Sequence, residues 1–368
     1  MDLISTIQNL IRIKTITGNE KEIKKAAEYI KSKFAGTEVM VEIFQSTASP
    51  VIFLRNRDTL EFNVLVLGHL DVVPADDDMF EPIIKDGKMY GRGTLDMKSF
   101  AVVAMNSMEY VCNHKLPLKF GVILSTDEEK GSKSLETFLE KYPSIKANIV
   151  LDNDVGGDIT KIVTKCKNPV FVKLISTGKE AHGSTPWAGI DANELLFKTW
   201  ENIRKIYPYF SSELPQPDEK WIDTVHFATL QGGQVSNIIS NYAEALLDFR
   251  LTENSSVENL KKNLDKCMEN GVVYKIVSES TPVVMDENNP DILSYKAFAE
   301  NILGQKIEFE HIGGATDSRS FAVRGSTVIM HSGNGDGMHA SNEYVDIKSV
   351  EQIADIQIKF LEYLAKKL

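Results

Sequence analysis

Histidine and acidic side chains follow several apolar runs of this 368-residue chain, and both types bind divalent metal ions in proteins. His69 and Asp71 come shortly after the apolar run 64–67. Two residues at this spacing point to the same side of an extended chain. A metal-bound histidine usually donates its second N–H to a carboxylate, so Asp71 is spaced to orient His69. By itself, the pair is also compatible with a strand-end histidine beside a surface acid.

Other acids are placed in a similar way. Asp96 follows two glycines in the segment 91–98 and precedes a helical pattern, so it could face a cation or simply cap the helix. Three consecutive acids occupy 127–129, after the apolar run 120–124. Acids this close repel one another unless a cation lies nearby, although a solvated acidic turn is the alternative. One glutamate of the three could bind a metal ion while its neighbour stays free as a base.

Two further segments complete this pattern. Asp152 and Asp154 follow the apolar run 149–151, and His339 lies in a glycine-rich loop. Two histidines with several carboxylates suit Zn²⁺, and Co²⁺ or Mn²⁺ are also possible. If one aspartate bridges two ions, the pair could activate water and polarise a carbonyl.

The elements that must position these residues belong to two patterns. Short apolar runs at 51–54, 64–67, 120–124 and 149–151 predict buried strands. Helical spacing predicts one helix before these runs, at 23–34, and another among them, at 100–111. This order is typical of an α/β fold with a mostly parallel sheet, in which functional groups lie at the carboxyl ends of strands.

The middle of the chain has a different pattern. Residues 170–176 and 244–251 alternate as half-buried antiparallel strands do, helical patterns cover 193–207 and 257–268, and the polar stretch 211–220 predicts a loop. After Pro282 the α/β pattern resumes. We therefore expect a catalytic metal-binding domain formed by 1–166 and 284–368, with a smaller α+β lid domain, 167–283, inserted in it.

Composition narrows the functional classes. The formal net charge is −11, and a surplus of acids argues against nucleic-acid binding. The sequence contains no run of 18 apolar residues, so no membrane-spanning helix is predicted. The three cysteines are scattered along the chain, so a disulfide framework is not expected. These features predict a soluble, cytoplasmic protein.

Taken together, the motifs resemble the M20 metallopeptidase family, which includes desuccinylases, deacetylases, aminoacylases, carnosinase-type dipeptidases and glutamate carboxypeptidase. The segment 68–71 reads Gly-His-Leu-Asp, Asp96 ends Gly-Arg-Gly-Thr-Leu-Asp, two glutamates occupy 128–129, and 338–343 reads Met-His-Ala-Ser-Asn-Glu. The resemblance runs in order from the first helix to the last strand. It implies a dinuclear-metal enzyme that hydrolyses an amide bond. A metal-free binding relative is the other class, but every ligand position here holds a competent residue.

The resemblance also implies individual roles. His69 and Asp152 would bind one ion, Glu129 and His339 would bind the other, and Asp96 would bridge both. Many relatives carry Glu-Pro-Thr where this chain has Asp152-Asn153-Asp154, whereas the dipeptidase-like branch carries an aspartate. We therefore expect Asp152 as the fifth ligand, with Asp154 as the alternative.

Two further roles concern the reaction. Asp71 would orient His69, and Glu128 would take a proton from a metal-bridging water and deliver it to the leaving amine. The peptide bond after Asp96 is often cis in the family.

Substrate-binding residues follow from the same resemblance. His182 would hydrogen-bond the developing oxyanion, in the active site of a partner subunit, and Asn237 would help to hold the substrate. Arg250 and Arg319 could each bind a substrate carboxylate, or could instead pair with nearby acids. Gly314 belongs to a glycine-rich loop expected near the metal ions.

The expected substrate is a small peptide, cleaved by a dipeptidase or exopeptidase activity. The alternative is an N-acyl amino acid, cleaved by a deacylase. In either case a homodimer formed through the lid domain is expected.

Overall fold

The computed structural model describes residues 1–45, 48–208 and 220–368, which form two compact units. Unit 1 comprises Met1–Thr164, Met285–Glu310 and Thr316–Leu368, and unit 2 comprises Lys165–Val284 and His311–Ala315. The boundaries expected for the inserted domain, 167 and 283, lie next to those of unit 2, whereas the segment 311–315 was not expected there.

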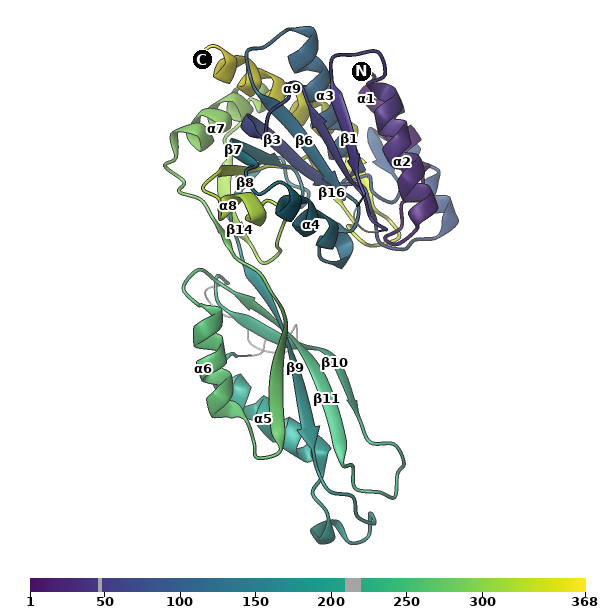
Figure 1. Cartoon of the computed structure of the whole chain (residues 1–368), viewed down its shortest axis with the longest axis vertical. Coiled ribbons are helices and arrows are strands. Elements are labelled where there is room, and N and C mark those ends of the chain that lie inside the picture. The colour runs from purple at the N-terminus through teal and green to yellow at the C-terminus, as the bar shows by residue number, and fades with distance from the viewer. Residues whose placement is uncertain (46–47, 209–219) are drawn as a thin grey trace. The chain divides into compact units, whose positions relative to one another are not determined.

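Unit 1 is built on a mixed sheet with a parallel centre (Figure 1). Its strand order is β1-β2-β6-β3-β7-β15-β8, and β14 also pairs with β8. The neighbours β6, β3, β7 and β15 run parallel, which confirms the mostly parallel α/β sheet. The strands are β1 (Met40–Phe44), β2 (Val51–Arg55), β3 (Glu61–His69), β6 (Phe120–Ser125), β7 (Lys146–Asp152), β8 (Lys161–Cys166), β14 (Glu308–Ile312) and β15 (Thr327–Met330).

Helices bury both faces of this sheet. Val64 and Val66 of β3 pack into one core together with residues of five helices, namely α1 (Leu3–Ile11), α2 (Glu20–Lys33), α3 (Lys98–Asn113), α7 (Pro290–Leu303) and α9 (Ile347–Ala365). Successive strand residues point to opposite faces, and on the other face Phe53 contacts Phe138 of α4 (Lys133–Lys141) with ring centroids 5.4 Å apart. The prediction that 64–67 is buried on both faces is therefore confirmed.

Within the described residues, three short 3₁₀ helices and one short α-helix lie between the main elements. They are η1 (Asp77–Phe80), η2 (Glu128–Lys130), η3 (Pro186–Ala188) and α8 (Arg319–Ala322). None of the helices in the described ranges is both long and apolar enough to cross a membrane.

A small second sheet in unit 1 joins two loops that are distant in sequence. Its order is β16-β17-β5-β4, formed by β4 (Ile83–Lys85), β5 (Lys88–Tyr90), β16 (Gly335–Asp336) and β17 (Tyr344–Asp346). Because β5 pairs with β17, the loop that follows β5 is held next to the loop that precedes β17.

The described part of unit 2 is an antiparallel sheet packed against α-helices. The strands β9 (Asn168–Thr177), β10 (Thr224–Gly232), β11 (Tyr242–Leu251) and β12 (Val272–Glu279) have the order β10-β11-β9-β12. Every second residue of β9 is buried, as the alternating sequence predicted. The buried side chains pack against α5 (Ala192–Ile206) and α6 (Val257–Cys267), and β13 (Val283–Val284) pairs with the end of β8. The loop predicted at 211–220 lies almost wholly outside the described residues.

Candidate metal centre

The carboxyl ends of three neighbouring parallel strands supply most of the candidate ligands. His69 is the last residue of β3, Glu128 and Glu129 follow β6, and Asp154 follows β7. Carboxyl ends of parallel strands meet at one edge of a sheet, so these side chains converge although they are far apart in sequence. Asp96 reaches the same edge from the loop before α3, and His339 reaches it from the loop between β16 and β17.

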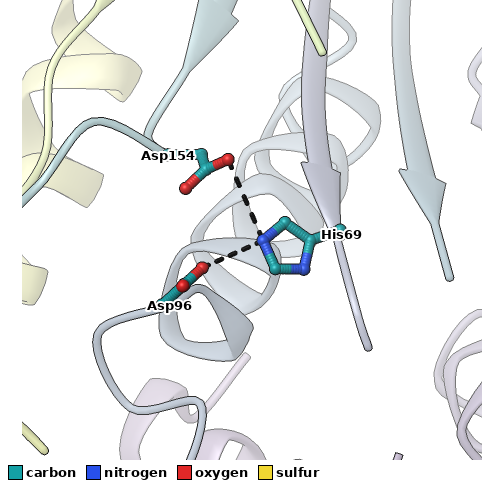
Figure 2. Close-up of side chains that lie close together, drawn as sticks. All are labelled: His69, Asp96 and Asp154. Carbon is teal, nitrogen blue, oxygen red and sulfur yellow. Dashed lines mark hydrogen bonds and ion pairs between the residues drawn. The ribbon is translucent and has the colours of Figure 1, made fainter. Parts of the chain in front are cut away.

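One group of potential ligands contains His69, Asp96 and Asp154 (Figure 2). The Nε2 atom of His69 lies 3.0 Å from Oδ1 of Asp96 and 3.9 Å from Oδ2 of Asp154. Each residue offers one ligand atom, and these atoms lie within 4.8 Å of one another. This spacing lets one ion contact all three.

The second group contains Asp96, Glu129 and His339. Nε2 of His339 lies 2.9 Å from Oδ2 of Asp96 and 3.2 Å from Oε2 of Glu129. Asp96 thus presents Oδ1 to one histidine and Oδ2 to the other. A carboxylate that shares its two oxygens between two ligand groups is suited to bridging two ions. The Asp96–Met97 peptide bond is cis, as the resemblance implied.

The donor set fits divalent cations. Burial, followed by the charge of Asp96, raises the pKa of Asp154 well above its usual value. Burial also raises the pKa of Glu128 to about 8, because the carboxylate form is poorly solvated there. A cation between these groups would compensate their negative charge. Nitrogen and carboxylate donors together suit Zn²⁺, Co²⁺ or Mn²⁺.

In both ligand groups, the Nε2 atom of the histidine, His69 or His339, already lies within hydrogen-bond distance of an Asp96 oxygen. A hydrogen bond with Asp96, reinforced by Glu129, raises the pKa of His339 to about 10. Burial opposes the charged form of His69, but hydrogen bonds with Asp71 and Asp96 outweigh burial and raise its pKa well above the usual value. Each ring therefore directs Nε2 into its ligand group.

Asp71 has more partners than the sequence indicated. Its carboxylate lies 3.5 Å from Nδ1 of His69, but the backbone oxygen of Asp71 is closer, at 3.0 Å. The same carboxylate accepts the backbone N–H groups of Glu128 at 3.1 Å and Glu129 at 3.3 Å, and the hydroxyl of Thr17 at 2.8 Å. Asp71 therefore holds the start of η2, from which both glutamates project.

The structure brings Asp154 to His69, and not the expected Asp152. Oδ1 of Asp152 accepts the backbone N–H of Asp154 at 2.9 Å. This local bond uses Asp152 in the turn that carries Asp154 forward, so Asp152 belongs to neither ligand group. The structure thus favours the alternative, Asp154, as the aspartate within reach of an ion bound at His69.

The candidate substrate residues of unit 2 lie at its surface. His182 is exposed, and its Nδ1 lies 2.8 Å from the Ser184 hydroxyl. The N–H of Gly183 donates to the backbone oxygen of Asn237 at 2.7 Å, so the His182 and Asn237 segments lie side by side. Gly314 is exposed and belongs to the short segment 311–315 of unit 2.

Both candidate arginines have partners close in sequence. Arg250 of unit 2 donates to the two carboxylate oxygens of Asp248, at 2.9 and 3.0 Å. Arg319 of unit 1 donates to the backbone oxygen of Thr316 at 2.9 Å and lies 3.8 Å from Asp317. These are the local pairings that the sequence left open as alternatives.

Buried groups outside the predicted set also hold the loops of the centre. Asp317 accepts the hydroxyls of Ser125 and Ser132, which flank the two glutamates. Lys98 is buried and donates to the backbone oxygens of Leu10 and Ile13, at 3.3 and 2.8 Å. No spacing rule identifies such residues, because their partners lie far away in the sequence.

Comparison with known proteins agrees with this architecture. The chain is 28% identical to succinyl-diaminopimelate desuccinylase of Helicobacter pylori, over the full length of both proteins. An M20 family metallo-carboxypeptidase of Sulfolobus solfataricus superposes with a TM-score of 0.84 at 18% identity, covering 100% of both chains. A Staphylococcus aureus tripeptidase superposes with a TM-score of 0.81 at 20% identity, covering 99% of this chain and 98% of the other.

The sequence profile of peptidase family M20/M25/M40 matches residues 65–363, which include both ligand groups and all of unit 2. On this evidence the chain belongs to peptidase family M20/M25/M40, a family of metal-dependent hydrolases.

Proposed function

We propose that this protein hydrolyses an amide bond in a small peptide with the help of two divalent metal ions. The observation that carries the proposal is the position of Asp96, which belongs to both ligand groups. His69 and Asp154 would hold one ion, and Glu129 and His339 would hold the other. Zn²⁺ is the ion we expect first, with Co²⁺ or Mn²⁺ as alternatives.

When bound, the two ions would polarise the scissile carbonyl and activate water. Glu128 would accept the proton of that water and then give it to the leaving amine. Burial raises the pKa of Glu128 above its usual value, and this favours uptake of a proton by the carboxylate. Asp71 keeps Glu128 in place through the backbone N–H bond.

Residues of unit 2 would complete the reaction, with His182 acting in the active site of a partner subunit. His182 has Nε2 available for a substrate oxygen, because Nδ1 already faces Ser184. Asn237, beside it, would contact the substrate. Arg250, whose side chain is 31% exposed, would bind a substrate carboxylate from the position in which Asp248 holds it. Arg319, of unit 1, is a second candidate for the carboxylate contact, and Gly314 is a further candidate substrate-binding residue.

Two observations bear on the substrate. Asp152-Asn153 stands where many family members have Glu-Pro, and an aspartate followed by asparagine is typical of the dipeptidase-like branch; this favours a peptide. The 28% identity with a desuccinylase favours the second candidate, deacylation of an N-acyl amino acid. Both reactions break an amide bond and would use the same catalytic residues.

A substrate panel separates these candidates. The purified protein, loaded with Zn²⁺, Co²⁺ or Mn²⁺, would be assayed against dipeptides, tripeptides, and N-acetyl and N-succinyl amino acids. We expect release of free amino acid from a peptide, and complete loss of activity after treatment with a chelator. Rapid deacylation without peptide turnover would establish the second candidate. Activity that survives chelation would contradict the metal mechanism.

We further propose that unit 2 acts as a lid and dimerisation domain, and that the enzyme works as a cytoplasmic homodimer without nucleic-acid or membrane partners. The apolar side chains exposed on unit 2, among them Trp187 and Val273, support a protein contact there. Size-exclusion chromatography with light scattering would measure the molar mass of the protein and so test this assembly. A monomer with full activity would contradict it.

A further inference from the structure

The buried carboxylate of Glu343 lies next to the candidate metal centre but belongs to neither ligand group. Glu343 precedes β17, and its side chain has no exposed surface. Oε1 accepts three backbone N–H groups of the loop that carries the shared ligand, from Gly93 at 3.0 Å, Leu95 at 2.9 Å and Asp96 at 3.2 Å. Oε1 of Glu343 therefore fixes the backbone of this loop at Asp96, the residue that belongs to both ligand groups.

The other oxygen of this carboxylate connects to the second loop. Oε2 of Glu343 accepts Nη1 of Arg92, and Nη2 of the same arginine donates to the backbone oxygen of His339 at 3.0 Å. His339 has φ +62°, a left-handed conformation that residues other than glycine rarely adopt. The guanidinium thus holds the backbone of a ligand in a conformation that needs outside support.

We propose that Glu343 is a positioning residue that sets Asp96 and His339 relative to each other, with Arg92 as its partner. The inference rests on the proposed metal-dependent function. Glu343 touches neither a ligand atom nor, in the proposal, the substrate. It acts through the two loops. Their backbones are also joined directly, because the Gly91 N–H donates to the backbone oxygen of Glu343 at 3.1 Å.

The chemistry of the contact explains why a carboxylate is required. An ionised carboxylate only accepts hydrogen bonds and has room for about four, so it can serve three N–H groups and one guanidinium together. A glutamine of the same shape has one accepting oxygen, and its NH₂ group would face either the loop N–H groups or Arg92. The substitution Glu343→Gln therefore opposes donor to donor without changing volume.

The test measures Co²⁺ binding as well as activity. Wild type and Glu343→Gln would be titrated with Co²⁺ while the visible absorption spectrum, which reports ligand geometry, is recorded. We expect Co²⁺ to bind the variant about 10–100-fold more weakly, with an altered spectrum. We expect a comparable loss in kcat with less change in KM, because the substrate contacts stay in place.

A matched control makes the same chemical change elsewhere in unit 1. Glu362 of α9 accepts hydrogen bonds from the Tyr110 hydroxyl and the Lys359 ammonium, and both partners lie outside the two ligand loops. Glu362→Gln should bind Co²⁺ with unchanged affinity and spectrum. If Glu343→Gln fails to fold, Arg92→Lys serves instead, since lysine keeps the charge but cannot bridge Glu343 and His339 with two nitrogens.

The outcomes separate the two proposals. Wild-type Co²⁺ affinity and spectrum in folded Glu343→Gln, or in Arg92→Lys where that variant is needed, would overturn the positioning role even if thermal stability fell. Failure of the wild-type protein to bind Co²⁺ at all would overturn the proposed function and, with it, this inference.

Discussion

The candidate ligands of unit 1 and the candidate substrate residues of unit 2 differ in how the protein holds them. His69 has a side chain only 1% exposed and contacts Asp96 and Asp154 from other loops. In unit 2, His182 lies at the surface, and the nearest polar partner of its ring is two residues away.

This difference indicates how much each region reveals by itself. The carboxylates of Asp96, Glu129 and Asp154 lie close together, with that of Glu128 beside them. Such a cluster is costly unless a cation is bound, so it is strong evidence for a functional site in unit 1. A half-buried arginine such as Arg250, already paired with Asp248, costs little to maintain, so its position alone is weak evidence. Metal binding should thus depend on unit 1 alone, whereas changes in unit 2 should affect turnover without affecting bound metal.

The largest effect is expected at Glu128. Glu128→Gln removes the proposed base and should lower kcat by about 10²–10⁴-fold while the metal content stays unchanged. Steady-state kinetics together with elemental analysis would measure both quantities. Glu136→Gln, on the exposed face of α4, is the matched control and should behave as wild type. A metal-loaded Glu128→Gln variant with wild-type kcat would remove Glu128 from the mechanism.

His182 tests the unit 2 side of the comparison. His182→Ala removes the proposed oxyanion donor and should lower kcat by about 10²–10³-fold, again without loss of metal. Exposed His226, also in unit 2, is the control, and His226→Ala should leave kcat unchanged. If His182→Ala lost metal as well, the separation between the two regions would be wrong.

The choice between two neighbouring aspartates sharpens the description of unit 1. Asp154→Asn should weaken the affinity for metal ions by about 10–100-fold, because it removes charge from one ligand group. Asp152→Asn should have a smaller effect on that affinity, since an asparagine oxygen can still accept the Asp154 N–H. Calorimetric titration with Zn²⁺ compares the two variants directly, and the reverse order would restore Asp152 as the ligand.

A separate effect concerns the stability of unit 1 against acid. His331 is buried, its Nε2 lies 2.8 Å from the Ile159 oxygen, and burial lowers its pKa to about 4. An unfolded histidine takes up a proton near pH 6.5 and the folded one does not, so stability falls as pH drops from about 6.5 to 4.

His331→Gln should remove this contribution, which amounts to about 3 kcal/mol in the free energy of unfolding at the acid end. Urea titrations of wild type and variant at several pH values would measure the difference. Equal pH dependence in the two proteins would exclude this role for His331. His226→Gln, at an exposed position, should retain the wild-type dependence.

The elements of the fold were largely predictable because their signals are local. The unbroken apolar runs that became β3, β6 and β7 indicated buried parallel strands, and the alternation that became β9 indicated an antiparallel strand. In an α/β sheet, the residues at the carboxyl ends of buried parallel strands lie along one edge. The convergence of His69 with the glutamates after β6 could therefore be predicted from the order of the apolar runs.

The sequence by itself determined which residue types reach the metal centre and in what order along the chain. Tertiary structure alone decided that Asp154 and not Asp152 faces His69, and that Glu343 holds the loops of Asp96 and His339. The physical reason is that the direction of a side chain beyond a strand depends on the hydrogen bonds of the following turn. The partners of a buried carboxylate, in turn, can come from 250 positions away, as Gly93 and Glu343 show.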